Sequence, residues 1–202
     1  MLPLIYTRPV VADTEQQRFI DLALSSDFPW FWQQSQTHDS RPYFWEQHLA
    51  PEQRPDYDIC NAPFFSHTLM TRSRDPAHSG VIASEYYQVF AALFHDWMTA
   101  VGLQYTHVYR MNLNLTMHHS SPHTVPHLDH EFEHYNFIMY LDTPPNSPTL
   151  IYDQGFRVIT EIPAVAGTAV SFPAQFHSHR YPPPEARRTV LVVTYGLVNS
   201  DK

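Results

Sequence analysis

The chain has 202 residues, of which 43% are hydrophobic, and this length and composition fit one globular domain and exclude an intrinsically disordered chain. The net charge of −8 disfavours a nucleic-acid backbone as a partner. The single cysteine, Cys60, excludes an internal disulfide and a multi-cysteine zinc site. It fits a reducing compartment. The short N-terminus lacks the features of a signal peptide, and no apolar run is long enough to span a membrane, so we expect a cytoplasmic protein.

The first half of the chain predicts two helices separated by an aromatic segment. The motif Thr14-Glu-Gln-Gln17 is a capping box that predicts a helix over 14–25. Residues 27–65 are irregular and rich in aromatic side chains, which either cover one side of the core or form a substrate lid or subunit contact. Residues 71–80 predict an exposed loop. Ser84 is expected to begin a helix that ends near Val101, with Gly102 as its C-terminal cap.

From residue 105 the hydrophobic period changes from helical spacing to two. In the segment 109–115, Arg110, Asn112 and Asn114 share one face, which is either solvent or a ligand pocket, while the other face is apolar. Further strands are expected at 135–141, 149–152, 156–162, 168–172, 179–181 and 189–195. Eighteen prolines and many short strands without intervening helices predict an antiparallel β-sandwich or jelly roll.

The tripeptide His127-Leu128-Asp129 is a candidate for two metal ligands. Residues two apart leave the same face of an extended strand, so both side chains can reach one ion. Downstream of the histidine-dense segment 118–134 the chain has only two histidines, His177 and His179, and either could supply a third ligand. Two histidines and one carboxylate on one face of a metal are typical of non-haem Fe(II) sites that activate oxygen. The other histidines of the dense segment 118–134 are expected to lie in loops or around the ligands.

Two adjacent arginines, Arg187 and Arg188, open the last predicted strand. The only lysine is Lys202, so every other permanent cation in the chain is an arginine. The planar fork of a guanidinium pairs with a carboxylate through two parallel hydrogen bonds, which suits these residues to hold an acidic ligand near the metal.

Taken together, residues 105–196 resemble the 2-oxoglutarate/Fe(II)-dependent dioxygenase family, particularly its prolyl-hydroxylase-like branch. The family pattern is matched in order by His127-Leu-Asp129, Phe137-Ile-Met-Tyr140-Leu-Asp142, His179-Arg-Tyr-Pro-Pro183 and Arg187-Arg188. The resemblance implies a mainly β fold with flanking helices, a double-stranded β-helix that is a distorted, cupin-like jelly roll. We therefore expect a single domain over 1–202, with a helical and aromatic-rich support region at 1–104 and the catalytic core at 105–196.

The resemblance also implies the cofactors and the roles of the residues. Fe(II) would be held by His127, Asp129 and a third histidine, for which His179 is preferred because the run His-x-Tyr-x-Pro matches the family, with His177 as the alternative. The far carboxylate of the cosubstrate 2-oxoglutarate would pair with an arginine and with Tyr140. Arg188, nine residues after His179, is favoured over Arg187, which fits equally well if His177 is the ligand. Asn112 and Asn114 are weaker candidates for the substrate or cosubstrate pocket.

The expected activity is that of an oxygenase that uses O2 and 2-oxoglutarate and releases succinate and CO2. Hydroxylation of a C–H bond in a protein side chain, an amino acid or a small metabolite is the default outcome for the family. One alternative is a cupin-like metal-binding protein that does not turn over 2-oxoglutarate. Another is a zinc hydrolase built on the histidine-rich segment. Iron-dependent conversion of 2-oxoglutarate to succinate separates the first reading from the other two.

Overall fold

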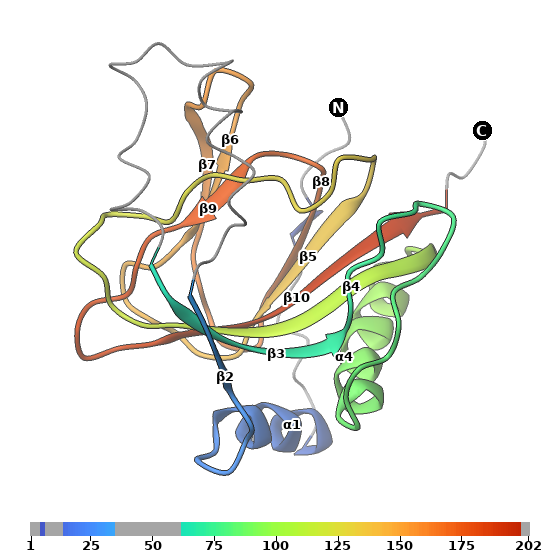
Figure 1. The fold of residues 1–202 in the computed structure, drawn as a ribbon, viewed down its shortest axis with the longest axis horizontal. Helices are drawn as coiled ribbons and strands as arrows, with labels where there is room; N and C mark the ends of the chain where they lie inside the picture. The colour runs from blue at the N-terminus through green and yellow to red at the C-terminus, as the bar shows by residue number, and fades with distance from the viewer. Residues whose placement is uncertain (1–4, 7–13, 35–61, 199–202) are drawn as a thin grey trace.

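The computed structural model describes residues 5–6, 14–34 and 62–198, which form two antiparallel sheets and two helices (Figure 1). The larger sheet has the order β1 (Ile5–Tyr6), β8 (Ala169–Pro173), β5 (Tyr135–Tyr140), β10 (Arg188–Leu197), β4 (Tyr105–Thr116), β3 (Phe64–Met70) and β2 (Phe31–Gln33). The smaller sheet has the order β7 (Val158–Ile162), β6 (Thr149–Tyr152) and β9 (His177–His179). The helices are α1 (Thr14–Leu24) and α4 (Tyr87–Ala100).

The C-terminal half alternates between the two sheets. The chain passes from β5 in the larger sheet to β6 and β7 in the smaller one, returns to β8, crosses again to β9 and ends in β10. This path is that of a jelly roll, which avoids a long unpaired edge by closing two sheets over one another. The expectation of a mainly β double-stranded β-helix with flanking helices is therefore confirmed.

The period-two pattern of the long strands creates two separate cores. In β10, Leu191 and Val193 face the helical side, whereas Val190 and Val192 face the smaller sheet. Trp97 of α4 packs against the larger sheet, with its ring centroid 4.9 Å from that of Phe137. Figure 1 shows α4 on the side of the larger sheet opposite to the smaller sheet. The helices thus support the larger sheet and leave its other face to build a site.

The second helix agrees with its predicted end but begins later than predicted. It starts at Tyr87, and the hydroxyl of Ser84 accepts a hydrogen bond from the backbone N–H of Tyr86 instead of capping the first turn from the position before the helix. Gly102 has a φ of 70°, a conformation that favours glycine, so its predicted role after the helix is confirmed. No helix among residues 14–34 and 62–198 is long and apolar enough to cross a membrane.

The aromatic segment and the ninth strand differ from their predictions. Residues 31–33, expected to be irregular, form β2 at the end of the larger sheet, where Phe31 and Trp32 are mostly exposed and do not cover the core. Phe28 is buried in the core as expected, and 35–61 lie outside the described residues. Strand β9 spans 177–179 instead of 179–181, because these residues pair with β6.

Candidate metal centre

The backbone places His127 directly opposite His177. His127 lies in the segment between β4 and β5, yet it forms an isolated antiparallel bridge with the first residue of β9. The N–H of each residue donates to the carbonyl of the other, at 2.9 and 3.1 Å. Residues paired in this way project their side chains to the same face. The two imidazole centroids are accordingly 4.5 Å apart, although the residues are fifty positions apart in sequence.

One ligand atom from each of His127, Asp129 and His177 lies within 4.8 Å of the other two. Nε2 of His177 is 3.5 Å from Oδ2 of Asp129. Oδ2 is buried and has no hydrogen-bond partner among the described residues. A buried carboxylate oxygen without a hydrogen bond raises the free energy of the folded state. A divalent cation bound by this oxygen and by the neighbouring histidines would remove that cost. The ligand set of two histidines and one carboxylate matches non-haem Fe(II).

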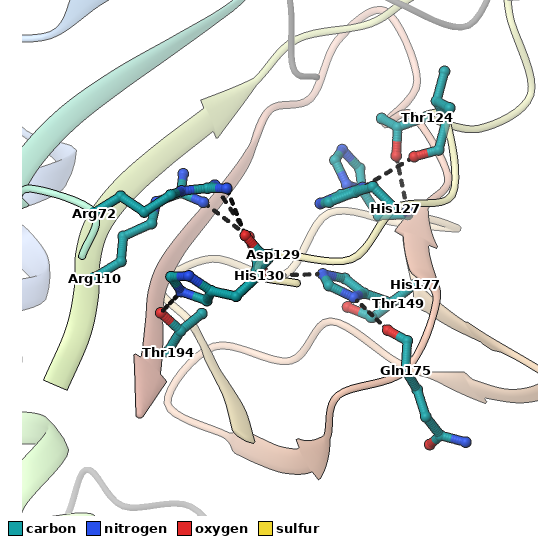
Figure 2. A network of polar contacts seen from close by, with 12 residues as sticks. Arg72, Arg110, Thr124, His127, Asp129, His130, Thr149, Gln175, His177 and Thr194 are labelled. Carbon is teal, nitrogen blue, oxygen red and sulfur yellow. Dashed lines mark hydrogen bonds and ion pairs between the residues drawn. The ribbon is translucent and has the colours of Figure 1, made fainter. Parts of the chain in front are cut away.

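The two histidines are held in the tautomer that a metal requires. Nδ1 of His127 is 3.0 Å from the carbonyl of Val125, and Nδ1 of His177 is 3.0 Å from the carbonyl of Gln175 (Figure 2). A carbonyl only accepts hydrogen bonds, so each Nδ1 must carry the proton and each Nε2 presents its lone pair. Burial lowers the pKa of His177, which keeps the ring neutral as a ligand.

The geometry favours His177, and not the preferred His179, as the third member of this group. Both residues lie in β9 and both line the same cavity, but His179 is two positions further along the strand, about 7 Å away along the backbone. His177 is the residue bridged to His127, and it is the one whose ligand atom lies within reach of Asp129. The family-like run after His179 describes sequence spacing, whereas the bridge between His127 and His177 depends on strand pairing.

Asp129 is oriented by two arginines that the sequence analysis did not assign to the site. Nη1 of Arg110 donates to Oδ1 at 2.9 Å, and Nη2 of Arg72 lies 3.5 Å from the same oxygen. Nη1 of Arg72 also donates to the main-chain carbonyl of Asp129. Figure 2 shows both guanidinium groups pointing toward this carboxylate. Burial alone would raise the pKa of Asp129, but Arg110 above all holds it well below its ordinary value, so the carboxylate is ionised.

Arg110 could have been assigned to the site from its sequence pattern, whereas Arg72 could not. Arg110 was visible on the polar face of the strand over 105–116, beside Asn112 and Asn114. Arg72 follows β3 within the segment predicted to be an exposed loop, and nothing in its local sequence indicates that it turns inward. Only the pairing of β3 with β4 brings it next to Arg110.

Arg188 is the first residue of β10 and lies buried against the smaller sheet. Its Nη2 donates to Oγ1 of Thr149 at 2.8 Å, and its guanidinium carbon is 5.5 Å from the centre of the Tyr140 ring. The hydroxyl of Tyr140 is 2.7 Å from the same Thr149 oxygen. Arg187 is exposed and donates to the carbonyl of Leu24, away from the site. The structure therefore brings Arg188 and Tyr140 together, as expected, and leaves Arg187 outside.

One cavity connects the metal group with Arg188. The residues that line it include the three members of the metal group, His179, Arg188 and, from the polar face of β4, Asn114. Asn112 and Tyr140 are not among the lining residues, but Tyr140 contacts two residues that are, Thr149 and Arg188. Nε2 of His179 is buried without a hydrogen-bond partner among the described residues. Burial and the nearby Arg188 hold the pKa of His179 well below its ordinary value, so this ring enters the cavity uncharged.

A second pair of histidines, His130 and His134, lies outside the metal group, with ring centroids 4.9 Å apart. Nε2 of His130 is 2.7 Å from the hydroxyl of Thr194, and burial lowers the pKa of His130 to about 3 (Figure 2). Nδ1 of His134 is 2.8 Å from the carbonyl of Phe132. These rings are neutral packing groups that fix the segment following Asp129.

The sequence matches no family model and no curated protein. Solved structures do match. An oxidoreductase of the 2OG-Fe(II) oxygenase family from Burkholderia pseudomallei has a TM-score of 0.65 and 15% identity, over 96% of this chain and 84% of the other. The α-ketoglutarate-dependent epimerase SnoN of nogalamycin biosynthesis has a TM-score of 0.53 and 11% identity, over 96% and 78%. AviO1 from Streptomyces viridochromogenes has a TM-score of 0.51 and 11% identity, over 98% and 91%. The chain has the fold shared by 2-oxoglutarate- and Fe(II)-dependent oxygenases.

Proposed function

We propose that the protein is a non-haem Fe(II)- and 2-oxoglutarate-dependent oxygenase with His127, Asp129 and His177 as its metal ligands. The observation that carries this proposal is the buried Oδ2 of Asp129, which has no hydrogen-bond partner within the described part of the chain and lies 3.5 Å from Nε2 of His177. The similarity in fold to oxygenases, including a SnoN structure that holds Fe3+ and α-ketoglutarate, supports the choice of metal and cosubstrate.

The chain supplies orientation and charge. Bound Fe(II) and 2-oxoglutarate supply the activation of O2, with release of succinate and CO2. Arg188 pairs with the far carboxylate of 2-oxoglutarate, and its neutral neighbours Thr149 and Tyr140 hold the guanidinium in place. Arg110 and Arg72 hold Asp129 ionised and turned so that Oδ2 faces the ligand histidines. The apolar side chains Val190 and Val192 line the cavity and limit the access of water.

The reaction we propose is hydroxylation of a C–H bond in a protein side chain, an amino acid or a small metabolite. The intact carboxylate ligand Asp129 fits this outcome, since halogenation in this family generally goes with its loss. The similarity in fold to an epimerase indicates that this fold also serves reactions other than hydroxylation, so product analysis is part of the test.

The test is anaerobic loading with Fe(II) and 2-oxoglutarate, followed by exposure to O2 and measurement of succinate. We expect slow, iron-dependent succinate formation that a substrate accelerates, and its absence from His177→Ala protein. Metal binding without 2-oxoglutarate binding or consumption would contradict the proposal and would favour a cupin-like metal-binding protein. Activity of the zinc-loaded protein in the absence of oxygen would favour a hydrolase.

A further inference from the structure

The side chains that line the candidate cavity carry more positive charge than Asp129 and the bound cosubstrate would neutralise. Its lining residues include three arginines, Arg72, Arg110 and Arg188, but only one carboxylate, that of Asp129. A divalent metal would add to this excess, and 2-oxoglutarate would compensate only part of it. A buried excess of positive charge is unfavourable unless an anion neutralises it.

Arg72 and Arg110 are only partly engaged by Asp129. Each contacts Oδ1 through a single nitrogen, and Nη1 of Arg72 donates to the main-chain carbonyl of Asp129, so neither guanidinium makes two parallel hydrogen bonds to the carboxylate. The side chain of Arg110 is 15% exposed and that of Arg72 is 35% exposed. Arg110 thus lies deeper in the site and Arg72 nearer to solvent, which leaves donors of both groups available to a molecule entering the cavity.

The backbone around Arg72 is fixed on both sides. The N–H of Thr71 donates to the carbonyl of Val81 at 2.9 Å, and the N–H of Ser73 donates to the carbonyl of Tyr109 at 2.7 Å. The second of these bonds ties Arg72 to β4 next to Arg110. A pre-positioned pair of guanidinium groups binds an oxyanion without first having to be ordered.

This pair is distinct from the arginine assigned to the cosubstrate. Within the ladder of β10 with β4, Arg110 pairs with Thr194 and Arg188 pairs with Thr116. The two positions are six residues apart along β4, a backbone distance of about 20 Å. Arg188 approaches the cavity from the side of Thr149, whereas the Arg72–Arg110 pair approaches it from the side of Asp129. One small dicarboxylate anchored at Arg188 does not account for both.

We propose that Arg72 and Arg110 form the subsite that binds a compact oxyanion of the primary substrate, so that the substrate is a small acid carrying a carboxylate or a phosphate next to the oxidised carbon. This inference rests on the proposed oxygenase function and adds the class of substrate to it. The net charge of −8 does not oppose it, because the local field at the cavity mouth is set by the arginine pair.

The first experiment tests the subsite without relying on turnover. The Nε–Hε signals of the arginine side chains are followed by NMR while acetate, inorganic phosphate or neutral acetamide is added, both to metal-free protein and to protein loaded with Zn(II) and 2-oxoglutarate. We expect acetate or phosphate, but not acetamide, to shift the signals of Arg72 and Arg110. The anion that binds more tightly, acetate or phosphate, identifies whether the subsite recognises a carboxylate or a phosphate group.

The matched variants are Arg72→Gln and Arg74→Gln. Both remove one positive charge from the same loop, but Arg74 is exposed and does not line the cavity. Loss of one charge-assisted contact should weaken anion binding by about tenfold in Arg72→Gln, and binding should be unchanged in Arg74→Gln. Unshifted arginine signals, or equal binding by wild type and Arg72→Gln, would overturn the proposal.

The second experiment uses turnover. Small acids, among them amino acids, hydroxy acids and phosphorylated metabolites, are compared with their amides or dephosphorylated forms as stimulators of 2-oxoglutarate consumption. We expect the acid alone to stimulate, and its KM to rise about tenfold in Arg72→Gln while the KM for 2-oxoglutarate stays constant. A raised KM for 2-oxoglutarate instead would assign the pair to the cosubstrate and refute the inference. If wild-type protein consumes no 2-oxoglutarate but anions still shift the arginine signals, the oxygenase proposal fails and the anion subsite stands.

Discussion

The two oxygens of Asp129 have different partners, and this division defines the centre at the scale of single residues. Oδ1 accepts from Arg110, whereas Oδ2 has no hydrogen-bond partner among the described residues and faces His177. The arginines therefore do more than hold the carboxylate ionised. They select which oxygen is left for a metal, because an ion that approached Oδ1 would meet two guanidinium groups.

Replacement of Asp129 by Asn removes the charge and keeps the size of the side chain. We expect Asp129→Asn to lower the affinity for Fe(II) by at least about tenfold, since a ligand substitution should cost no less than the loss of a supporting hydrogen bond. The measurement is bound iron per protein after anaerobic loading and desalting. Glu161→Gln, which removes an exposed carboxylate paired with Arg180, is the control and should bind iron as wild type does. Equal iron content in Asp129→Asn and wild type would remove Asp129 from the ligand set.

The paired variants His177→Ala and His179→Ala separate the two histidines of β9. We expect His177→Ala to lose iron, because its Nε2 belongs to the ligand group, and His179→Ala to retain it. Since Nε2 of His179 lies in the cavity and has no hydrogen-bond partner in the part of the chain that the structure describes, removal of this ring should affect 2-oxoglutarate binding instead and raise the KM for 2-oxoglutarate. Loss of iron in His179→Ala with retention in His177→Ala would restore the ligand assignment based on sequence spacing.

At the scale of the elements, the strand pattern was predictable where one face is buried and the other lines the site. The alternation along β4 predicted both its core face and the polar face that carries Arg110 and Asn114. The order of the motifs also indicated that His127-Leu-Asp129, the histidines at 177 and 179 and Arg188 belong together, and all of these except Leu128 line one cavity. The choice between His177 and His179 was not predictable, because both point the same way and only the bridge to His127 distinguishes them. Arg72 was missed for the same reason, as its position depends on the pairing of β3 with β4, which α4 separates in the sequence.

Gly80 is essential to the loop that positions Arg72. A Cβ at this residue would lie 2.0 Å from the carbonyl oxygen of Thr71, which is backbone and cannot move aside without disturbing the pairing of Thr71 with Val81. We expect Gly80→Ala to destabilise the protein by roughly 1–3 kcal/mol, measured by urea unfolding, and to weaken anion binding as Arg72→Gln does. Ser79→Ala, a substitution of the exposed neighbour, should change neither quantity. Wild-type stability and anion binding in Gly80→Ala would show that the loop tolerates a shift.

Tyr195 connects strands β10 and β8 across β5 through a side-chain hydrogen bond. Its hydroxyl is 2.7 Å from Oγ of Ser171, and burial raises the pKa of Tyr195 to about 12. The folded state therefore holds the phenol proton more tightly than the unfolded chain, whose tyrosines ionise near pH 10. This contribution to stability is fully present below pH 10 and is lost as the pH rises from there toward 12.

Replacement of Tyr195 by Phe tests that linkage. The variant should be about 1 kcal/mol less stable at pH 7, since Ser171 loses its partner, and its stability should fall less steeply between pH 10 and 12. Urea unfolding curves at pH 7, 10 and 11 provide the measurement, with Tyr86→Phe, at the partly buried residue before α4, as the control. An unchanged alkaline slope in Tyr195→Phe would assign the loss of stability to other groups.

At the scale of the whole molecule, the candidate metal centre lies where the two sheets meet. His177 belongs to the smaller sheet, whereas Asp129 is tied to the larger sheet by its ion pair with Arg110 of β4. His127 is part of the segment that connects β4 with β5, and it pairs with β9. A metal bound by all three residues would link the two sheets, in addition to filling a polar site.

Metal binding should therefore stabilise the fold and protect one region more than the rest. We expect Mn(II), used as an ion that resists oxidation by air, to raise the unfolding temperature, with a further rise when 2-oxoglutarate is added. A ligand at a hundred times its Kd stabilises the native state by about 2.7 kcal/mol through mass action alone.

Hydrogen exchange should slow chiefly in β9 and around His127, because these segments are joined through the site, and slow little in α4. Asp129→Asn should show neither the shift nor the local protection. Equal stabilisation of Asp129→Asn would mean that the ion binds elsewhere, and protection spread evenly over both sheets and the helices would mean that the centre does not act as a link between the sheets.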